Sequence, residues 1–223
     1  MEKQNQWFAR SGLLRRLVVT ALALAVWFWT QSLLGARVLP ASGIGDGLHA
    51  LTAPINAFLH QSPAAANALL ILSSAVIDAL GLFLLGCWLF GGVLRPFLGL
   101  LLLLGLRQVL QALCALPAPP GMIWHQPGFP SLLVTYGVAS DFFFSGHTAI
   151  AVLGGIELAR FRHRWLTALA IPIVIFEIAT VIVLRAHYTM DVFTGIVAAL
   201  WVAYVSERIA PHIDRRFRGL EAR

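Results

Sequence analysis

The stretch Asp141-Phe-Phe-Phe-Ser-Gly-His-Thr148 decides how this sequence is interpreted. Polar residues are sparse along the chain, yet this stretch places an acid, a serine and a histidine at the start of an apolar segment. A second stretch, Arg185-Ala-His-Tyr-Thr-Met-Asp191, lies further along and also begins an apolar segment. Most of the remaining residues are apolar, so these two stretches are the strongest candidates for a functional site.

The composition indicates an integral membrane protein. Of 223 residues, 59% are hydrophobic and 12% are charged, and the mean hydropathy is +0.80. A typical soluble domain carries about 25% charged residues, because its surface must be polar. The net charge of +6 comes without a basic patch interleaved with aromatic residues, so we expect no nucleic-acid partner.

Six apolar segments are candidates to cross a bilayer, whose hydrocarbon core is about 30 Å thick. They cover residues 17–38, 67–94, 97–116, 142–159, 165–184 and 187–209. The chain length fits one domain. The sequence therefore predicts an all-α, polytopic membrane protein: a bundle of six transmembrane helices in a single domain over residues 1–223, with the catalytic motifs at about 95–195. A cleavable signal peptide is the alternative for the first segment, although Trp27-Phe28-Trp29 makes it longer than a typical signal core.

The basic residues indicate how the bundle is oriented. With the amino terminus in the cytoplasm, only Arg37 and Arg185 fall in the outer loops, as the positive-inside rule requires. The inner loops and ends then hold Lys3, Arg10, Arg15, Arg16, Arg95, Arg160, Arg162, Arg164, Arg208, Arg215, Arg216, Arg218 and Arg223. We therefore expect both termini in the cytoplasm and the two histidine motifs facing the periplasm, the lumen or the exterior. The use of arginine in place of lysine indicates a bacterial gene, and so a bacterial inner membrane.

The spacing of His187 and Asp191 is typical of an oriented catalytic base. Residues four apart lie on one face of a helix, and a carboxylate bonded to one ring nitrogen fixes the tautomer and raises the basicity of the other. A histidine held in this way is suited to act as a nucleophile. Orientation of His187 explains the position of the Asp191 carboxylate better than a metal site does. We therefore expect no metal and no cofactor.

The run Ser145-Gly146-His147 is typical of a helix start that binds phosphate. Free backbone N–H groups and the positive end of the helix dipole attract a phosphate oxygen there. Serine caps such a start, and glycine lets the backbone approach closely. His147 beside a bound phosphate is placed to act as a general acid, which accelerates a reaction by about 10²–10⁴. A lone histidine near the end of a span is explained well enough by packing at the membrane interface. Two histidine motifs at the same face of the membrane are explained less well in that way.

These two motifs resemble the third and fourth signature motifs of the sphingomyelin synthase family, a branch of the lipid phosphate phosphatase superfamily. The stretch Arg107-Gln-Val-Leu-Gln-Ala-Leu-Cys-Ala-Leu-Pro-Ala-Pro119 is similar to the arginine-to-Leu-Pro-x-Pro stretch of that family. The matches run in order from about residue 95 to residue 195, on a plan of six spans like the family's. Phe144 and Val181 stand where phosphatases have a proline and a Ser-Arg pair, which favours the synthase branch.

The resemblance implies a phospholipid headgroup phosphotransferase acting on phospholipid and lipid-alcohol substrates. His187, helped by Asp191, attacks the phosphorus, diacylglycerol leaves with help from His147, and the phosphohistidine passes the headgroup to ceramide or a related lipid alcohol. Transfer to water instead would make the same His/His/Asp site that of a membrane lipid phosphatase or a phospholipase C-type hydrolase. A lipid-binding protein that keeps the motifs without activity is a third interpretation.

Five further residues are candidates for binding the substrate: Asp141, Ser145, Gly146, Arg107 and Arg185. Asp141 would orient His147 or the incoming hydroxyl, although an acid near a helix start is also common. Arg185 would clamp the phosphate. Arg107 would do so from within the membrane, or would pair with Asp78 on the preceding span.

Overall fold

The computed structural model describes residues 44–114, 116–134, 136 and 142–221, together with Leu22, Ala25, Val26 and Trp29. The chain divides into two units, Met1–Gly45 and Asp46–Arg223, and the second unit contains every element discussed below. Helices make up this part of the chain and its described residues include no strand, which confirms the predicted all-α class. The first predicted span, 17–38, lies outside the described residues apart from four positions, and a single domain stays a prediction.

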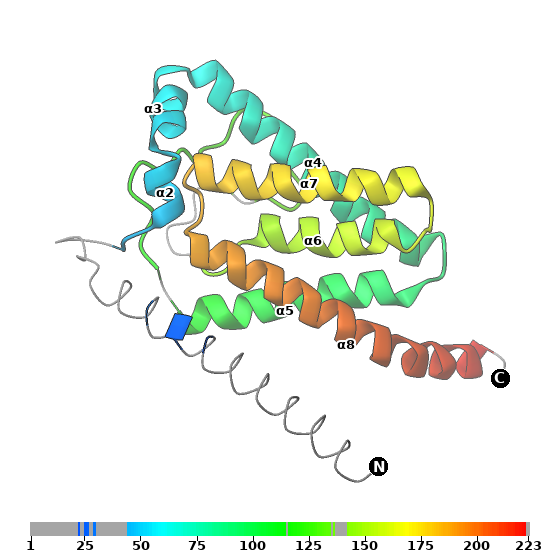
Figure 1. Ribbon diagram of the computed structural model, residues 1–223. Helices are drawn as coiled ribbons and strands as arrows, with labels where there is room; N and C mark the ends of the chain where they lie inside the picture. Colours follow the sequence, from blue (N-terminus) through cyan, green and yellow to red (C-terminus); the bar gives the residue numbers. More distant parts are fainter. Residues whose placement is uncertain are drawn as a thin grey trace, which may run out of the picture. The chain divides into compact units, whose positions relative to one another are not determined.

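Seven helices are described (Figure 1). They are α2 (Gly47–Leu51), α3 (Ala53–Gln61), α4 (Pro63–Leu89), α5 (Leu94–Leu113), α6 (Gly146–Ala159), α7 (Arg164–Val183) and α8 (Thr189–Glu221). By length and composition, α4, α5, α7 and α8 over Thr189–Arg215 can cross a membrane. The described residues thus contain four candidate spans, and the six predicted spans are not confirmed, because α6 has only 14 residues.

The turn between α4 and α5 lies before Arg95 and not at the predicted break between residues 94 and 97. α4 ends at Leu89, and Gly92 takes a φ of 62°, a conformation that glycine adopts without strain. α5 then begins at Leu94, with Pro96 in its first turn. The prediction was misplaced because a proline in the first turn starts a helix as readily as it ends one: its missing N–H would have no helical partner there.

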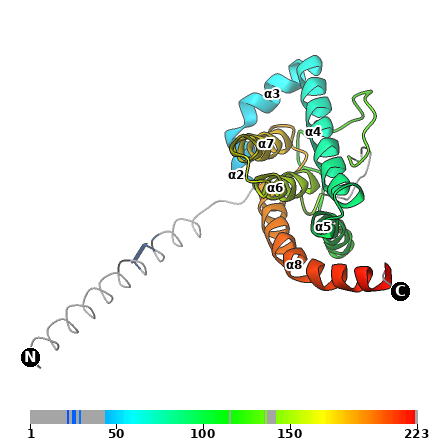
Figure 2. The same cartoon turned by 90° about the vertical axis from the view of Figure 1, so that its right-hand side faces the viewer.

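Helix α6 is the central helix of the second unit. It packs against α4, α5, α7 and α8, and Figure 2 shows it nearly end-on among them. All its residues from His147 to Gly155 are buried. At 1.5 Å per residue its length is about 21 Å, which is less than the hydrocarbon core of a bilayer. Because four helices pack around α6, its first turn can lie below the membrane surface with its polar groups shielded from lipid.

Ion pairs join the helices at one end of this unit. Arg95 at the start of α5 donates two hydrogen bonds, of 3.1 and 2.6 Å, to the buried carboxylate of Glu157 near the end of α6. Arg160 likewise donates two, of 3.1 and 2.8 Å, to Glu207 on α8. His147 and His187 lie together at the opposite end, with the loops around them. Which side of the membrane that end faces stays a prediction.

Two carboxylates within the spans have partners that stabilise the fold. Asp78 on α4 accepts hydrogen bonds from the Ser131 hydroxyl at 3.1 Å and from two backbone N–H groups of residues 132 and 133 at 2.8 Å each. Glu177 on α7 is fully buried and accepts a hydrogen bond of 2.7 Å from the Ser73 hydroxyl on α4. Asp78 therefore holds a loop, and Glu177 links two helices.

Candidate active site

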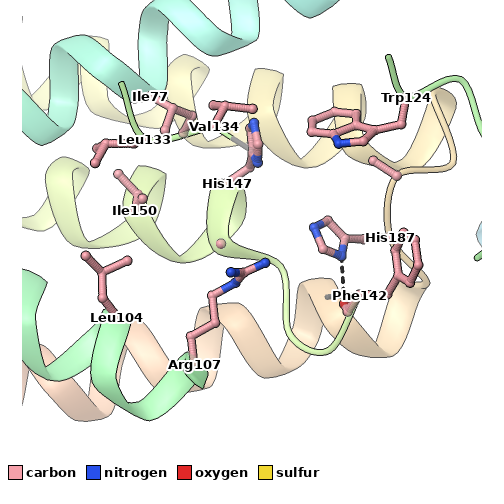
Figure 3. Close-up of a pocket in the computed structure, with 12 residues that line it drawn as sticks. Ile77, Leu104, Arg107, Trp124, Leu133, Val134, Phe142, His147, Ile150 and His187 are labelled. Carbon is pink, nitrogen blue, oxygen red and sulfur yellow. Dashed lines mark hydrogen bonds between the residues drawn. The ribbon is translucent and has the colours of Figure 1, made fainter. Parts of the chain in front are cut away.

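A single cavity brings the two histidine motifs together (Figure 3). Its volume is about 50 Å³, and its lining residues are Ile77, Leu104, Arg107, Trp124, Leu133, Val134, Phe142, Gly146, His147, Ile150, Ala186 and His187. One water needs about 10–15 Å³ of such space, and a drug-sized ligand needs about 300–1,000 Å³. The cavity therefore has room for a phosphoryl-sized group and not for a whole lipid.

The ring of His187 is held by the backbone carbonyl of Phe142. His187 Nδ1 lies 2.8 Å from that oxygen, and Figure 3 shows this bond beside the cavity. A carbonyl oxygen only accepts hydrogen bonds, so Nδ1 carries a proton. In the neutral ring the lone pair then lies on Nε2, which makes Nε2 the atom available to act as a nucleophile or base.

Asp191 does not make the predicted hydrogen bond to His187. Its Oδ2 atom lies 3.8 Å from His187 Nδ1, which is too far for a hydrogen bond, and accepts from the Tyr188 N–H at 2.9 Å instead. The prediction failed because α8 begins only at Thr189, so His187 precedes the helix and the four-residue spacing does not act as a helical one. The buried carboxylate still places a negative charge next to the ring, which stabilises an imidazolium.

His147 lies in the first turn of α6. The hydroxyl of Ser145 caps this helix by accepting the Thr148 N–H at 3.3 Å. The His147 ring is buried and meets the ring of Trp124 edge to face, with centroids 5.2 Å apart. Its Nε2 atom is buried and has no hydrogen-bond partner within the part of the chain that the structure describes. Since buried polar atoms are usually paired, this nitrogen is available to a bound ligand.

Arg107 reaches the start of α6 because residue 146 has no side chain. The Arg107 Nε donates to the carbonyl oxygen of Phe144 at 3.3 Å. A Cβ atom at Gly146 would lie 3.1 Å from that Nε, closer than ordinary contact allows. A guanidinium next to a helix start forms a site for an anion, because the cation and the free N–H groups both favour phosphate oxygens.

The other predicted binding residues lie elsewhere. Ser145 is fully buried, and its N–H donates to the carbonyl oxygen of Asp191 at 3.1 Å, so it joins the two motifs without lining the cavity. Arg185 donates to the carbonyl oxygens of Pro120 at 3.0 Å and His49 at 3.2 Å, so the structure places it among the loops and not at the cavity. Asp141 lies outside the described residues.

Two features of the site escaped the sequence prediction. The Phe142 carbonyl has no signal in the sequence, because every residue carries one. Gly195 did have a signal, since it lies one helical turn after Asp191. A Cβ atom there would lie 2.7 Å from the Ser145 carbonyl oxygen, so glycine lets α8 approach the loop that precedes α6.

Among the residues that the structure describes, no group of three His, Cys, Asp or Glu is placed to hold a metal ion.

Comparisons with known proteins place the chain among lipid phosphotransferases. The chain is 22% identical over 169 residues to phosphatidylcholine:diacylglycerol cholinephosphotransferase 1 of Arabidopsis thaliana, a match that covers 76% of this chain and 55% of that protein. The chain thus spans little more than half the length of this curated relative. This match supports the predicted resemblance at the level of lipid phosphotransferases, without reaching sphingomyelin synthase itself. No solved structure matches. The family model described as AtPDCT1/2 matches residues 46–208, which include both histidine motifs, and the chain therefore belongs to the AtPDCT1/2 family.

Proposed function

We propose that this protein is a phospholipid headgroup phosphotransferase, which moves phosphocholine or a similar headgroup from a glycerophospholipid to a lipid alcohol. The observation that carries the proposal is the cavity of about 50 Å³ in which His147, His187 and Arg107 face one phosphoryl-sized space. Membership of the AtPDCT1/2 family supports the same reaction class.

The first half-reaction transfers the phospho-headgroup to His187. The Nε2 lone pair forms a bond to phosphorus, and the bond from phosphorus to the glycerol oxygen breaks. The leaving oxygen takes a proton from His147 and departs as diacylglycerol. The anionic phosphodiester itself favours a protonated His147. The new phosphoimidazole ring is positive, and the Asp191 carboxylate 3.8 Å from its Nδ1 stabilises that charge.

The second half-reaction restores the histidine. The hydroxyl of the acceptor lipid gives its proton to His147 and attacks phosphorus, while the bond from phosphorus to His187 Nε2 breaks. Arg107 and the first N–H groups of α6 balance the charge on the phosphoryl oxygens in both steps. No metal is needed in this scheme, because the charge is balanced by protein groups.

The walls of the cavity favour transfer over hydrolysis. Apolar side chains from four parts of the chain line it, and they disfavour water next to the phosphohistidine: Ile77, Leu104, Val134 and Ile150. A lipid alcohol needs to bring only its hydroxyl into this space, while its acyl chains stay outside the cavity. Diacylglycerol is the first acceptor to test, because the Arabidopsis relative is named for it, and ceramide is the second, on the sequence motifs.

The test uses the purified full chain in lipid nanodiscs, with phosphatidylcholine labelled in its choline, and no added metal. Diacylglycerol of distinct chain length and ceramide are supplied separately. We expect labelled headgroup on an acceptor with wild type and none with His187→Ala, while Glu207→Gln at the opposite end stays active. Soluble labelled phosphocholine that forms without an acceptor would instead establish a hydrolase, and absence of any turnover would overturn the proposal.

A further inference from the structure

The short helix α2 lies against the segment that carries His187. Residues 184–188 belong to neither α7 nor α8, so no helix fixes the backbone of His187. Arg185 in this segment has a φ of 53°, a left-handed conformation that residues other than glycine seldom adopt. Contacts from elsewhere must therefore hold this segment in place.

Asp46 supplies one set of these contacts. Its Oδ2 atom accepts the Thr189 N–H at 2.6 Å, and its Oδ1 atom accepts the Thr189 hydroxyl at 2.6 Å and the His49 N–H at 3.0 Å. The carboxylate therefore caps α2 and holds the first residue of α8 at the same time. Such charge-assisted bonds are stronger than bonds between neutral groups.

His49 supplies the second set. Its Nε2 atom lies 2.9 Å from the backbone carbonyl oxygen of His187, and since a carbonyl only accepts, Nε2 is the donor. The His49 side chain is 4% exposed, and its ring lies beside that of Tyr188, with centroids 5.7 Å apart. Arg185 in turn donates to the His49 carbonyl oxygen at 3.2 Å. Asp46 and His49 together thus contact four of the five residues from Arg185 to Thr189.

We propose that Asp46 and His49 are positioning residues for His187: they hold its backbone so that its Nε2 faces the cavity while the Phe142 carbonyl holds Nδ1. This inference rests on the proposed function. It assigns a role in catalysis to a helix that lies before all of the sequence motifs. A displacement of about 1 Å at a reacting group can lower a rate by about 10²-fold. Loss of the contacts from Asp46 and His49 should therefore lower the rate of the chemical step.

The experiment compares two substitutions at His49 with a matched one at His60. His49→Phe keeps a ring beside Tyr188 and removes the donor, whereas His49→Gln keeps an N–H donor. His60 on α3 is exposed and bonds the carbonyl oxygen of Gly121 at 3.1 Å, away from His187, so His60→Phe makes the same chemical change at a bond remote from the site and serves as the control. We expect His49→Phe to lower kcat about tenfold or more relative to His60→Phe, with KM within about threefold of wild type, and His49→Gln to recover most of kcat.

Equal kcat values for His49→Phe and His60→Phe, or an effect on KM alone, would overturn the inference. If His49→Phe does not fold, Thr189→Val replaces it, because this change removes only the hydroxyl donor to Asp46, and Thr189→Ser is its matched rescue. Hydrogen exchange of residues 185–189 is the readout that does not need activity. It should accelerate in His49→Phe and not in His60→Phe; unchanged exchange overturns the inference. If wild type transfers no headgroup, the proposed function fails, whereas the exchange result still decides whether α2 holds this segment.

Discussion

The Nδ1 of His187 donates a hydrogen bond of 2.8 Å to the carbonyl oxygen of Phe142, which lies 45 residues earlier in the chain. The two histidine motifs are therefore joined directly, and the backbone of one motif orients the ring of the other. Asp191 stands 3.8 Å from the same nitrogen and contributes charge. In the proposed mechanism the carboxylate and the carbonyl would thus divide the two tasks that one aspartate performs in a typical triad.

This division predicts unequal effects at His187 and Asp191. His187→Ala should abolish headgroup transfer, because the nucleophile is gone. Asp191→Asn should lower kcat by about 10- to 100-fold, because it removes charge next to the ring and leaves the tautomer in place. Transfer assays on both variants, with circular dichroism to confirm folding, check this. Folded Asp191→Asn protein as inactive as His187→Ala would mean that the carboxylate also orients the ring.

The role of His147 predicts a dependence on the leaving group. His147→Ala should lower transfer from a phospholipid by about 10²–10⁴, because the glycerol oxygen leaves without a proton. A p-nitrophenyl ester of phosphocholine needs no such proton, so formation of the phosphoenzyme from it should be nearly normal in His147→Ala and absent in His187→Ala. Rates of nitrophenol release test this, and an equal loss with both substrates would argue against a general acid.

The contact between Gly146 and Arg107 predicts a loss of phosphate binding in Gly146→Ala. The new Cβ would lie 3.1 Å from Arg107 Nε, so the guanidinium must move by a few tenths of an ångström, which lengthens its contacts at the start of α6. We expect kcat/KM to fall about tenfold, as for one displaced charge-assisted bond. Gly105→Ala on α5 is the control, since its Cβ meets nothing within 4 Å, and it should keep wild-type kinetics. Unaltered kinetics in Gly146→Ala would remove Arg107 from the phosphate site.

The close approach at Gly195 predicts a loss of stability. A Cβ atom there would lie 2.7 Å from the backbone oxygen of Ser145, and backbone cannot move aside as a flexible side chain does. Gly195→Ala should therefore destabilise the fold by about 1–3 kcal/mol. Thermal unfolding in detergent, compared with Gly105→Ala, measures this. A Tm equal to that of the control would show that α8 can move away from the Ser145 carbonyl without loss of stability.

The hydrogen bonds of Asp46 predict that the stability of α2 depends on pH in the acid range. Burial by itself raises the pKa of this carboxyl, but the bonds from the Thr189 hydroxyl and N–H and from the His49 N–H outweigh it and hold the pKa below its usual value of 3.8. A lowered pKa means that the ionised form stabilises the fold above about 3.8 and that this contribution is lost as the pH falls through the folded-state pKa. The protection factors of the α2 amides, which are corrected for the intrinsic pH dependence of exchange, should therefore fall below that pH in wild type.

Asp46→Asn provides the comparison for this effect. The amide does not titrate in this range, so the protection factors of the α2 amides should be lower than wild type at neutral pH and should change little between pH 7 and the acid limit. A variant that keeps the wild-type pH dependence would assign it to another carboxylate.

The sequence by itself determined the all-α class and the pairing of the two histidine motifs. Hydropathy and motif spacing are local properties, so they predict which segments are helical and which residues carry the chemistry. They also predicted that Arg107 and Gly146 serve the phosphate site, and the structure brings both to the cavity that His147 and His187 line.

Only the tertiary structure decided which atoms hold those residues. The spacing of His187 and Asp191 suits a helix, yet α8 begins after the histidine, and a distant carbonyl takes the bond that the carboxylate was expected to make. The same holds for Asp46, whose partner Thr189 lies far along the chain. Backbone carbonyls and N–H groups are alike at every residue, so no sequence pattern says which of them will meet. That choice is made when the helices pack, because packing alone sets the distances between segments that are remote in the chain.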